Sequence, residues 1–206
     1  MDSEIEIRKM NNKDFKKAIN FAVKGMHFNM YLKNKFLLKL YGKYFWYMEL
    51  LRSSQIISAY IGDEFVGVLL ADIKGEPKIY KSFWKSIFIK FIDWFQNTFV
   101  RDGVGPYDTA NKEMLKNYKE KDKIDGEICF LAADPDCKTR GIGSKLLEEL
   151  EKREKGKTIF LYTDDKCTYQ FYEHREFEKV GEKDIELEIE NRKIPLKCLM
   201  YCKKII

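Results

Sequence analysis

Two apolar runs on either side of a glycine-containing helix constrain the fold of this chain more than any other feature. The runs are GEICFLAAD, residues 126–134, and TIFLYTD, residues 158–164. Each has the length of a strand and little polar alternation, which is typical of strands covered on both faces. Between them lies DPDCKTRGIGSKLLEELEKREK, residues 134–155, a turn followed by a helix that we expect over about 141–155. This order predicts a mixed α/β domain.

The remaining patterns supply further elements before and after this unit. The expected strands cover residues 4–10, the hairpin 55–75 and a final hairpin of 177–189 with 194–204. The expected helices cover about 13–24, 33–51, 79–98, 108–120 and 167–175. Because the chain has no internal repeat and no clear linker, we expect a single domain over residues 1–206, with a helical insertion-like segment at about 75–125.

Composition excludes several classes of protein. Hydrophobic residues make up 45% of the chain and aromatic residues 15%, which supports a buried core and argues against disorder. The 38 basic and 33 acidic residues give a net charge of +5. Such a mild excess suits an anionic ligand but is not the signature of a nucleic-acid-binding protein. We therefore expect no nucleic-acid partner.

The cysteines and the N-terminal stretch bear on the compartment. The five cysteines, at positions 129, 137, 167, 198 and 202, lack the paired spacing of a zinc site, so we expect free thiols and no bound metal. The charged stretch MDSEIEIRKM is not a secretory signal, and no apolar run reaches the roughly 18–20 residues that span a bilayer. The expected location is cytoplasmic, without stable membrane insertion.

Two glycines, Gly141 and Gly143, stand where the helix after the first apolar run begins, with Lys138 and Arg140 just before them. A helix N-terminus exposes unpaired N–H groups and a partial positive charge, so it binds anions. Glycines there let a phosphate reach the N–H groups, although an ordinary turn can use them for packing alone. Because the P-loop and dinucleotide patterns are both incomplete, the spacing favours a cradle for the pyrophosphate of another cofactor.

The quoted segment DPDCKTRGIGSKLLEEL resembles the acyl-CoA-binding motif of the GNAT superfamily of N-acyltransferases, Gln/Arg-x-x-Gly-x-Gly/Ala after a central strand. Downstream, TIFLYTDDKCTYQFYEHREFEKVGE, residues 158–182, is similar to the family's strand, Phe-Tyr helix and Phe-led strand. The resemblance extends over roughly residues 4–74 and 126–204. It implies an α/β (α+β) fold, in which helices flank a mixed, mostly antiparallel central sheet of about six to seven strands that is splayed at the cofactor strand.

The chain departs from the family pattern at four positions. Lys138 replaces the usual Gln or Arg, and Glu176 stands where the family usually has glycine. Asp165 and Thr168 replace a frequent Asn and Ala. Lys138 keeps the donor character but not the planar fork of arginine. The other changes bear on the geometry of the turn after the strand.

By this resemblance the cofactor is acetyl-CoA, bound as a co-substrate. Its pyrophosphate is expected on Lys138 and on the backbone N–H groups of Thr139, Arg140, Gly141, Ile142, Gly143 and Ser144. Its pantetheine arm is expected beside the main chain of Leu131, Ala132 and Ala133.

The implied reaction is attack by an amine on the thioester, which needs a base for the amine and an acid for the departing thiolate. Tyr172 aligns with the family's usual acid and is also expected to contact the cofactor. Glu127 stands where one branch of the family carries a catalytic glutamate. Two other interpretations remain open, namely that Tyr172 is an aromatic packing residue and that Glu127 is a solvated residue at the start of a strand.

The function implied is transfer of an acetyl group from acetyl-CoA to a primary amine by direct attack on the thioester. The alternative is a non-catalytic CoA-binding regulatory or interaction module on the same fold. No motif selects the acceptor, which the family takes from small molecules or peptides. A homodimer also remains open, because the terminal hairpin can pair across two chains or within one.

An aromatic helix expected over residues 79–98 has no counterpart in the family pattern. One apolar stripe runs along it, formed by Trp84, Ile87, Phe88, Phe91, Ile92 and Phe95, with lysines off the stripe. Three interpretations stay open: a core or dimer helix, a lid near the acceptor end of the active site, and a membrane-surface anchor.

Overall fold

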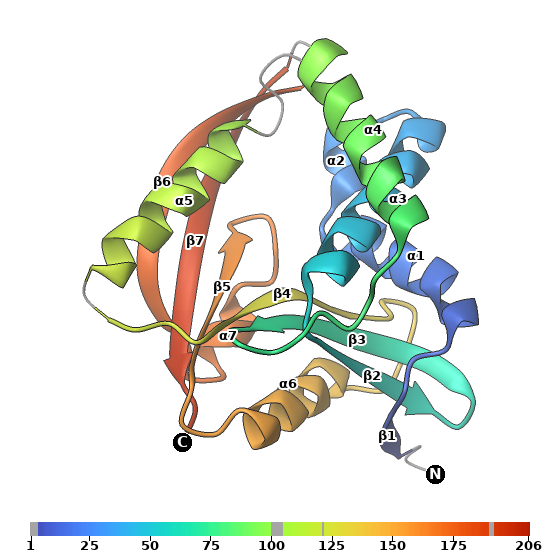
Figure 1. The fold of residues 1–206 in the computed structure, drawn as a ribbon, viewed down its shortest axis with the longest axis vertical. Coiled ribbons are helices and arrows are strands. Elements are labelled where there is room, and N and C mark those ends of the chain that lie inside the picture. Colours follow the sequence, from blue (N-terminus) through green and yellow to red (C-terminus); the bar gives the residue numbers. More distant parts are fainter. Residues whose placement is uncertain (1–3, 100–104, 121, 190–191) are drawn as a thin grey trace. The chain divides into compact units, whose positions relative to one another are not determined.

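The computed structural model describes residues 4–99, 105–120, 122–189 and 192–206 (Figure 1). In this part of the chain seven strands follow the order β1-β2-β3-β4-β5-β7-β6. The β1–β2, β2–β3, β5–β7 and β6–β7 pairs are antiparallel. The expected α/β fold with a mostly antiparallel sheet flanked by helices is thus confirmed.

The contacts divide the chain into two compact units, and each is described by itself. Unit 1 contains the chain up to Ile89 together with Ile128–Lys155 and Ile206. Unit 2 contains Lys90–Glu127 and Gly156–Ile205. The single domain expected from the sequence stays a prediction.

Unit 1 is built on the strands β1 (Ile5–Arg8), β2 (Gln55–Ile61), β3 (Glu64–Ile73) and most of β4 (Gly126–Ala133). β2 and β3 form the expected hairpin. Gly62 makes its turn at φ 55°, a conformation that glycine adopts without strain. Nearly all of β3 is buried, which agrees with helices on both of its faces.

The helices of unit 1 cover two faces of these strands. They are η1 (Asn12–Asp14), α1 (Phe15–Gly25), α2 (Phe28–Tyr31), α3 (Lys35–Arg52) and α6 (Ile142–Arg153). Val68 and Leu70 of β3 share a core with Trp46 of α3. On the other face, a Cβ at Gly67 would lie 2.6 Å from Ile142 of α6, so only glycine permits this approach. Figure 1 accordingly shows α6 on the opposite side of β2 and β3 from α1 and α3.

Local sequence explains where α3 begins, but not the short helix before it. α3 begins after Asn34, whose side chain accepts hydrogen bonds from the N–H groups of Phe36 at 2.9 Å and Leu37 at 3.2 Å. Between α1 and α3, His27 takes a left-handed conformation at φ 51°, and the short helix α2 follows it. No pattern in the sequence predicted α2.

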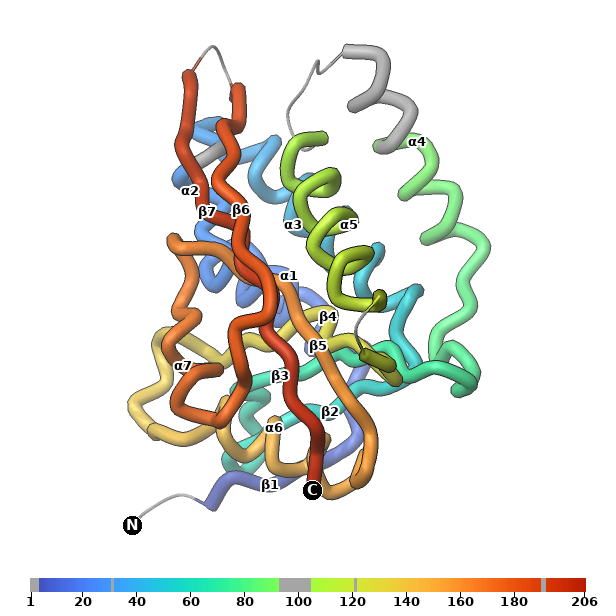
Figure 2. Tube along the Cα trace, turned by 90° about the vertical axis from the view of Figure 1, so that its left-hand side faces the viewer, coloured from blue at the N-terminus to red at the C-terminus, as the bar shows by residue number. Residues whose placement is uncertain are grey.

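Unit 2 contains β5 (Thr158–Asp164), β6 (Glu178–Ile189) and β7 (Arg192–Lys204), with the helices α5 (Gly105–Lys119) and α7 (Gln170–Glu173). α5 lies along β6 and β7 (Figures 1 and 2). Its Met114 joins Phe160 and Met200 in the core of this unit. A Cβ at Gly181 of β6 would lie 3.0 Å from the Met114 sulfur, so glycine lets α5 pack closely on the strand.

The helix α4 (Phe83–Phe99) confirms the aromatic helix expected over residues 79–98. Its apolar stripe divides into a covered and an exposed part. Phe88 meets Tyr47 of α3 edge to face, with ring centroids 5.9 Å apart, and Ile92 is buried. Trp84 is exposed, so the core interpretation is wrong for this residue. The side chain of Phe95 lies outside the described residues.

Candidate functional site

The cradle segment, residues 134–144, follows β4 directly and is fixed to unit 1 by Asp134. The Asp134 N–H donates to the Val66 carbonyl at 2.7 Å. Its buried carboxylate accepts hydrogen bonds from Lys17 of α1 at 2.7 Å and from the Asp136 N–H at 3.0 Å. The Cys137 N–H donates back to the Asp134 carbonyl at 3.1 Å. These bonds determine where the chain turns toward α6.

The charge of Asp134 is part of this anchor. Burial opposes its ionisation, but the hydrogen bonds from Lys17 and the Asp136 N–H outweigh burial and hold the pKa of Asp134 below its ordinary value. A second ion pair joins Lys24 to Asp136 at 2.6 Å. Two lysines of α1 therefore hold the first half of the cradle segment. Sequence reasoning missed both, because nothing local to α1 indicates contact with a turn so far along the chain.

Gly141 occupies the N-cap position of α6 in the left-handed region, at φ 85°. A Cβ built there would meet no atom within 4 Å. The first intrahelical bond runs from the Lys145 N–H to the Gly141 carbonyl, at 2.9 Å. Ile142 and Gly143 open the first turn of α6, and the first N–H groups of a helix have no acceptor within the helix. This end of α6 presents N–H groups and open space, which suits an anion.

The other residues expected at the cofactor differ in exposure. Lys138 and Arg140 are exposed and Thr139 is half-buried, whereas the Ile142 side chain is buried. In β4, Ala132 is buried, Leu131 half-buried and Ala133 exposed. β4 stands at the centre of the strand order as expected, but buried and half-buried residues alternate along it, so the expectation of complete burial is wrong.

The tyrosine segment, residues 164–177, is organised in unit 2 by two aspartates at the end of β5. Asp164 accepts from the N–H groups of Lys166 at 2.9 Å and Cys167 at 3.1 Å. Asp165 accepts from the Lys197 N–H of β7 at 3.0 Å, and its own N–H donates to the Lys197 carbonyl at 3.1 Å. A carboxylate oxygen here accepts as the amide oxygen of asparagine can, so this departure from the family pattern keeps the turn bound to β7.

Tyr172 lies in α7 within an aromatic cluster of unit 2. Its ring packs edge to face on Phe171 at 5.3 Å and on Phe177 at 5.8 Å, and it tilts against Tyr201 at 6.4 Å. Burial and the nearby Cys167 raise the pKa of Tyr172 well above its ordinary value. The phenol therefore holds its proton at neutral and mildly alkaline pH, as a general acid must before it acts.

Glu176 follows α7 in the left-handed region, at φ 62°. The turn is closed by the Phe177 N–H, which donates to the Tyr172 carbonyl at 3.1 Å. Here the chain has glutamate where the family usually has glycine, yet it adopts the glycine-like conformation. The glutamate is thus compatible with a left-handed residue in this turn.

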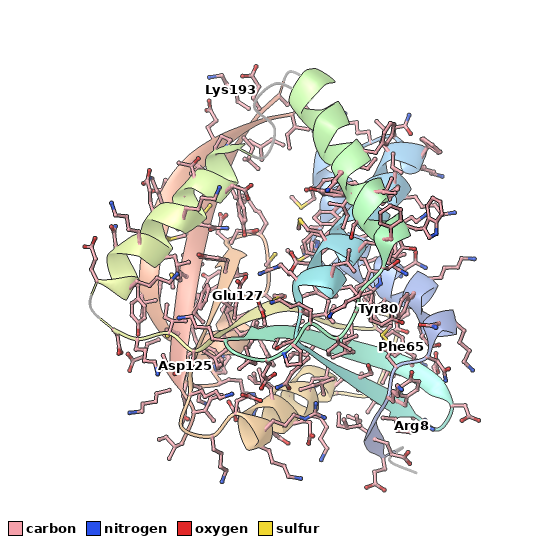
Figure 3. All side chains as sticks on the ribbon, viewed as in Figure 1. Arg8, Phe65, Tyr80, Asp125, Glu127 and Lys193 are labelled. Carbon is pink, nitrogen blue, oxygen red and sulfur yellow. The ribbon has the colours of Figure 1, made fainter. Side chains whose placement is uncertain are left out.

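Glu127 is half-buried at the start of β4, close to Asp125 (Figure 3). Asp125 fixes this entry to the first residue of β5: its N–H donates to the Thr158 carbonyl at 2.8 Å, and its carboxylate accepts from the Thr158 N–H at 3.0 Å. Glu127 and Tyr172 belong to unit 2. The other residues expected at the cofactor belong to unit 1.

Other kinds of chemistry find little support in the described ranges. None of the five cysteines forms a disulfide there. Burial and Asp164 raise the pKa of Cys167 to about 12, which keeps it a thiol and makes it a poor nucleophile. Within the residues placed by the structure, no group of three or more His, Cys, Asp or Glu side chains is arranged to hold a metal ion.

No helix among the residues described is long and apolar enough to cross a bilayer.

Solved structures resemble the chain over nearly its whole length. A histone acetyltransferase HPA2-related protein from Corynebacterium glutamicum has a TM-score of 0.55 at 14% identity, with 98% of this chain and 97% of that one covered. The PaiA N-acetyltransferase of Thermoplasma acidophilum, solved with coenzyme A, has a TM-score of 0.52 at 15% identity over 98% and 99%. A ribosomal-protein alanine N-acetyltransferase from Escherichia coli has 0.51 at 13% over 98% and 94%. These likenesses establish the fold.

Sequence comparison gives the family. No curated protein sequence matches the chain. The model of the acetyltransferase (GNAT) family matches residues 26–177, which is most of the chain and includes both the cradle segment and the tyrosine segment. The chain belongs to the GNAT family of acetyltransferases.

Proposed function

We propose that this chain transfers an acetyl group from acetyl-CoA to a primary amine of a small molecule or peptide. Membership of the GNAT family supports acetyl transfer in general. The observation that carries the cofactor assignment is Gly141, which is left-handed at the N-terminus of α6 with open space where a Cβ would stand. An anion approaching there can reach the backbone N–H groups at the start of α6.

In this proposal the cradle segment holds the cofactor's pyrophosphate. Its ligands are the side chain of Lys138 and the N–H groups of Thr139, Arg140, Gly141, Ile142, Gly143 and Ser144. The main chain of Leu131, Ala132 and Ala133 binds the pantetheine arm. The ion pairs of Lys17 and Lys24 support this assignment, because they fix the turn before any ligand arrives. Bound acetyl-CoA supplies the activated thioester.

Two residues of unit 2 handle protons in the proposed reaction. Tyr172 gives its proton to the departing thiolate, and its raised pKa means that the phenol still carries this proton when the thiolate leaves. Glu127 accepts a proton from the acceptor amine, directly or through water, so that the neutral amine attacks the thioester. No covalent enzyme intermediate is needed, in keeping with the protonated state of Cys167.

Release of free thiol from acetyl-CoA, measured with a panel of small amines, amino acids and peptides, tests the proposal. We expect one class of amine to accelerate release, and mass spectrometry to find that amine heavier by one acetyl group. Tight acetyl-CoA binding by calorimetry, with no acceleration by any amine and no acetylated product, would instead identify a non-catalytic CoA-binding module.

A further inference from the structure

The apolar surface of α4 is wider than its contacts within the protein require. At about 100° per residue around a helix, Phe83, Ile87, Phe91 and Trp84 occupy one arc of about 100°. Phe88 and Ile92 continue this arc, and they are the covered part: Phe88 contacts Tyr47 of α3, and Ile92 is buried. Phe88 and Ile92 already attach the helix to the protein. The other apolar residues of α4 are therefore not needed for this attachment.

The outer face of α4, defined as Phe83, Trp84, Ile87 and Phe91, is strongly exposed. The exposed fractions are 74% for Phe83, 79% for Trp84, 42% for Ile87 and 57% for Phe91. Single exposed apolar residues are ordinary on protein surfaces, but four large ones that share one face of one helix mark an interaction surface.

The charge along this segment is mainly positive. From Pro77 to Asp93 the chain carries lysines at positions 78, 81, 85 and 90 and one acidic residue, Asp93. Lys81 and Lys90 are exposed, whereas Lys78 is paired with Asp72. Lys85 is held over the rings of Phe15, Tyr47 and Tyr80 at 5.9, 5.3 and 5.5 Å from their centroids.

We propose that the outer face of α4 binds the surface of an anionic lipid bilayer. Aromatic and aliphatic side chains on one helix face enter the boundary between headgroups and acyl chains, and lysines beside them attract the anionic headgroups. A second copy of the chain fits the same face less well, because a two-fold contact through it sets lysines against lysines. The attachment is interfacial and needs no spanning helix. It does not depend on acetyl transfer.

Vesicle flotation with the full chain tests this inference. The probes are vesicles of phosphatidylcholine alone and vesicles with about a third of phosphatidylserine, each at low and high salt. We expect the protein to float with the anionic vesicles at low salt, at least tenfold more than with neutral ones, and to be released at about 0.5 M salt because screening weakens the lysine contacts.

Matched variants locate the surface. The double change Phe83→Ser with Trp84→Ser removes apolar area, and Lys81→Glu with Lys90→Glu reverses charge. Both pairs are exposed, so melting temperature and acetyl-CoA binding should stay near wild type while flotation falls severalfold or more. The control is Lys152→Glu with Lys155→Glu, which makes the same charge change at exposed lysines in and just after α6 and should still float.

The remaining outcomes overturn the inference. Wild-type protein that stays unbound with anionic vesicles refutes it, as does binding that the α4 changes leave intact or that the α6 control abolishes equally. Sedimentation velocity tests whether a second copy of the chain binds this face instead. A concentration-dependent dimer that dissociates in the Phe83→Ser, Trp84→Ser variant, together with no vesicle binding by wild type, would assign the face to that second copy. The salt series on wild type stands even where a variant fails to fold.

Discussion

The turn before α6 and the turn after α7 each place one residue in the left-handed region, but they use different amino acids. Gly141 stands there at φ 85° and Glu176 at φ 62°. For a residue with a Cβ this conformation costs about 1–2 kcal/mol, which the protein accepts at position 176. The comparison teaches that the left-handed conformation alone does not demand glycine in this fold.

The surroundings explain why glutamate is tolerated after α7. The Glu176 side chain is 88% exposed, and its carboxylate lies 3.6 Å from Lys203. The buried ring of Phe177 and the bond from its N–H to the Tyr172 carbonyl hold the turn. At Gly141 a Cβ would also meet open space, so packing does not explain that glycine either. What distinguishes Gly141 is its N-cap position in α6, beside the N–H groups that we propose bind the pyrophosphate.

The largest effect is expected at Tyr172, the proposed general acid. Tyr172→Phe keeps the ring contacts with Phe171, Phe177 and Tyr201 but removes the proton, so kcat should fall by about 10²–10⁴ while the affinity for acetyl-CoA stays nearly unchanged. Steady-state kinetics from pH 6 to 9 measure this. A variant with wild-type kcat over the whole range would make Tyr172 a packing residue.

A second large effect is expected in the cradle segment. Gly143→Glu places a carboxylate in the first turn of α6, where it competes with the pyrophosphate, and we expect affinity for acetyl-CoA to fall by about tenfold or more. The helix itself should remain stable, because an acidic residue in the first turn is favourable to the helix dipole. Calorimetry with acetyl-CoA measures the change, and Gly143→Ala is the control that adds bulk without charge. Unchanged binding by folded Gly143→Glu would leave the glycines as packing devices.

A smaller effect compares the two left-handed positions directly. Gly141→Ala should lower the free energy of unfolding by about 1–2 kcal/mol, because alanine at this φ is strained whatever the space around it. Denaturant titration in the absence of ligand measures this cost. If glycine at 141 serves the ligand as well, affinity for acetyl-CoA falls in addition. A loss of stability with unchanged affinity would mean that Gly141, like Glu176, serves only the backbone conformation of its turn.

The smallest effect is expected at the other turn and has the opposite sign. Glu176→Gly relieves left-handed strain at the expense of a more flexible unfolded chain and a weak surface ion pair, for a net gain of about 0.5–1 kcal/mol. Thermal unfolding should show a slightly higher Tm, with kinetics unchanged. A lower Tm would mean that the Lys203 pair outweighs the backbone strain, and the comparison with Gly141 would fail.

Much of the fold could be predicted because it depends on short-range patterns. The hairpin at Gly62, the β6–β7 hairpin, the starts and ends of α3 and α6 and the end of α4 follow from periodicity, turn residues and apolar runs, whereas α4 begins four residues later than expected. The patterns around Gly141, Gly143 and Tyr172 also indicated the family, and the family model matches residues 26–177. Those residues lie within two short segments, so their spacing is readable in the sequence.

Other features needed the tertiary structure, because they depend on residues far apart in the chain. The sequence determined that α4 has a broad apolar stripe, but only the contact of Phe88 with Tyr47 decided which half is covered. Lysine at position 17 is ordinary for a helix, and only folding brings it to the buried carboxylate of Asp134. The glutamate at 176 is readable as a departure from glycine, whereas its left-handed φ follows from the bonds that close the turn on Tyr172. Backbone conformations and ion pairs of this kind are set by partners that local propensity does not encode.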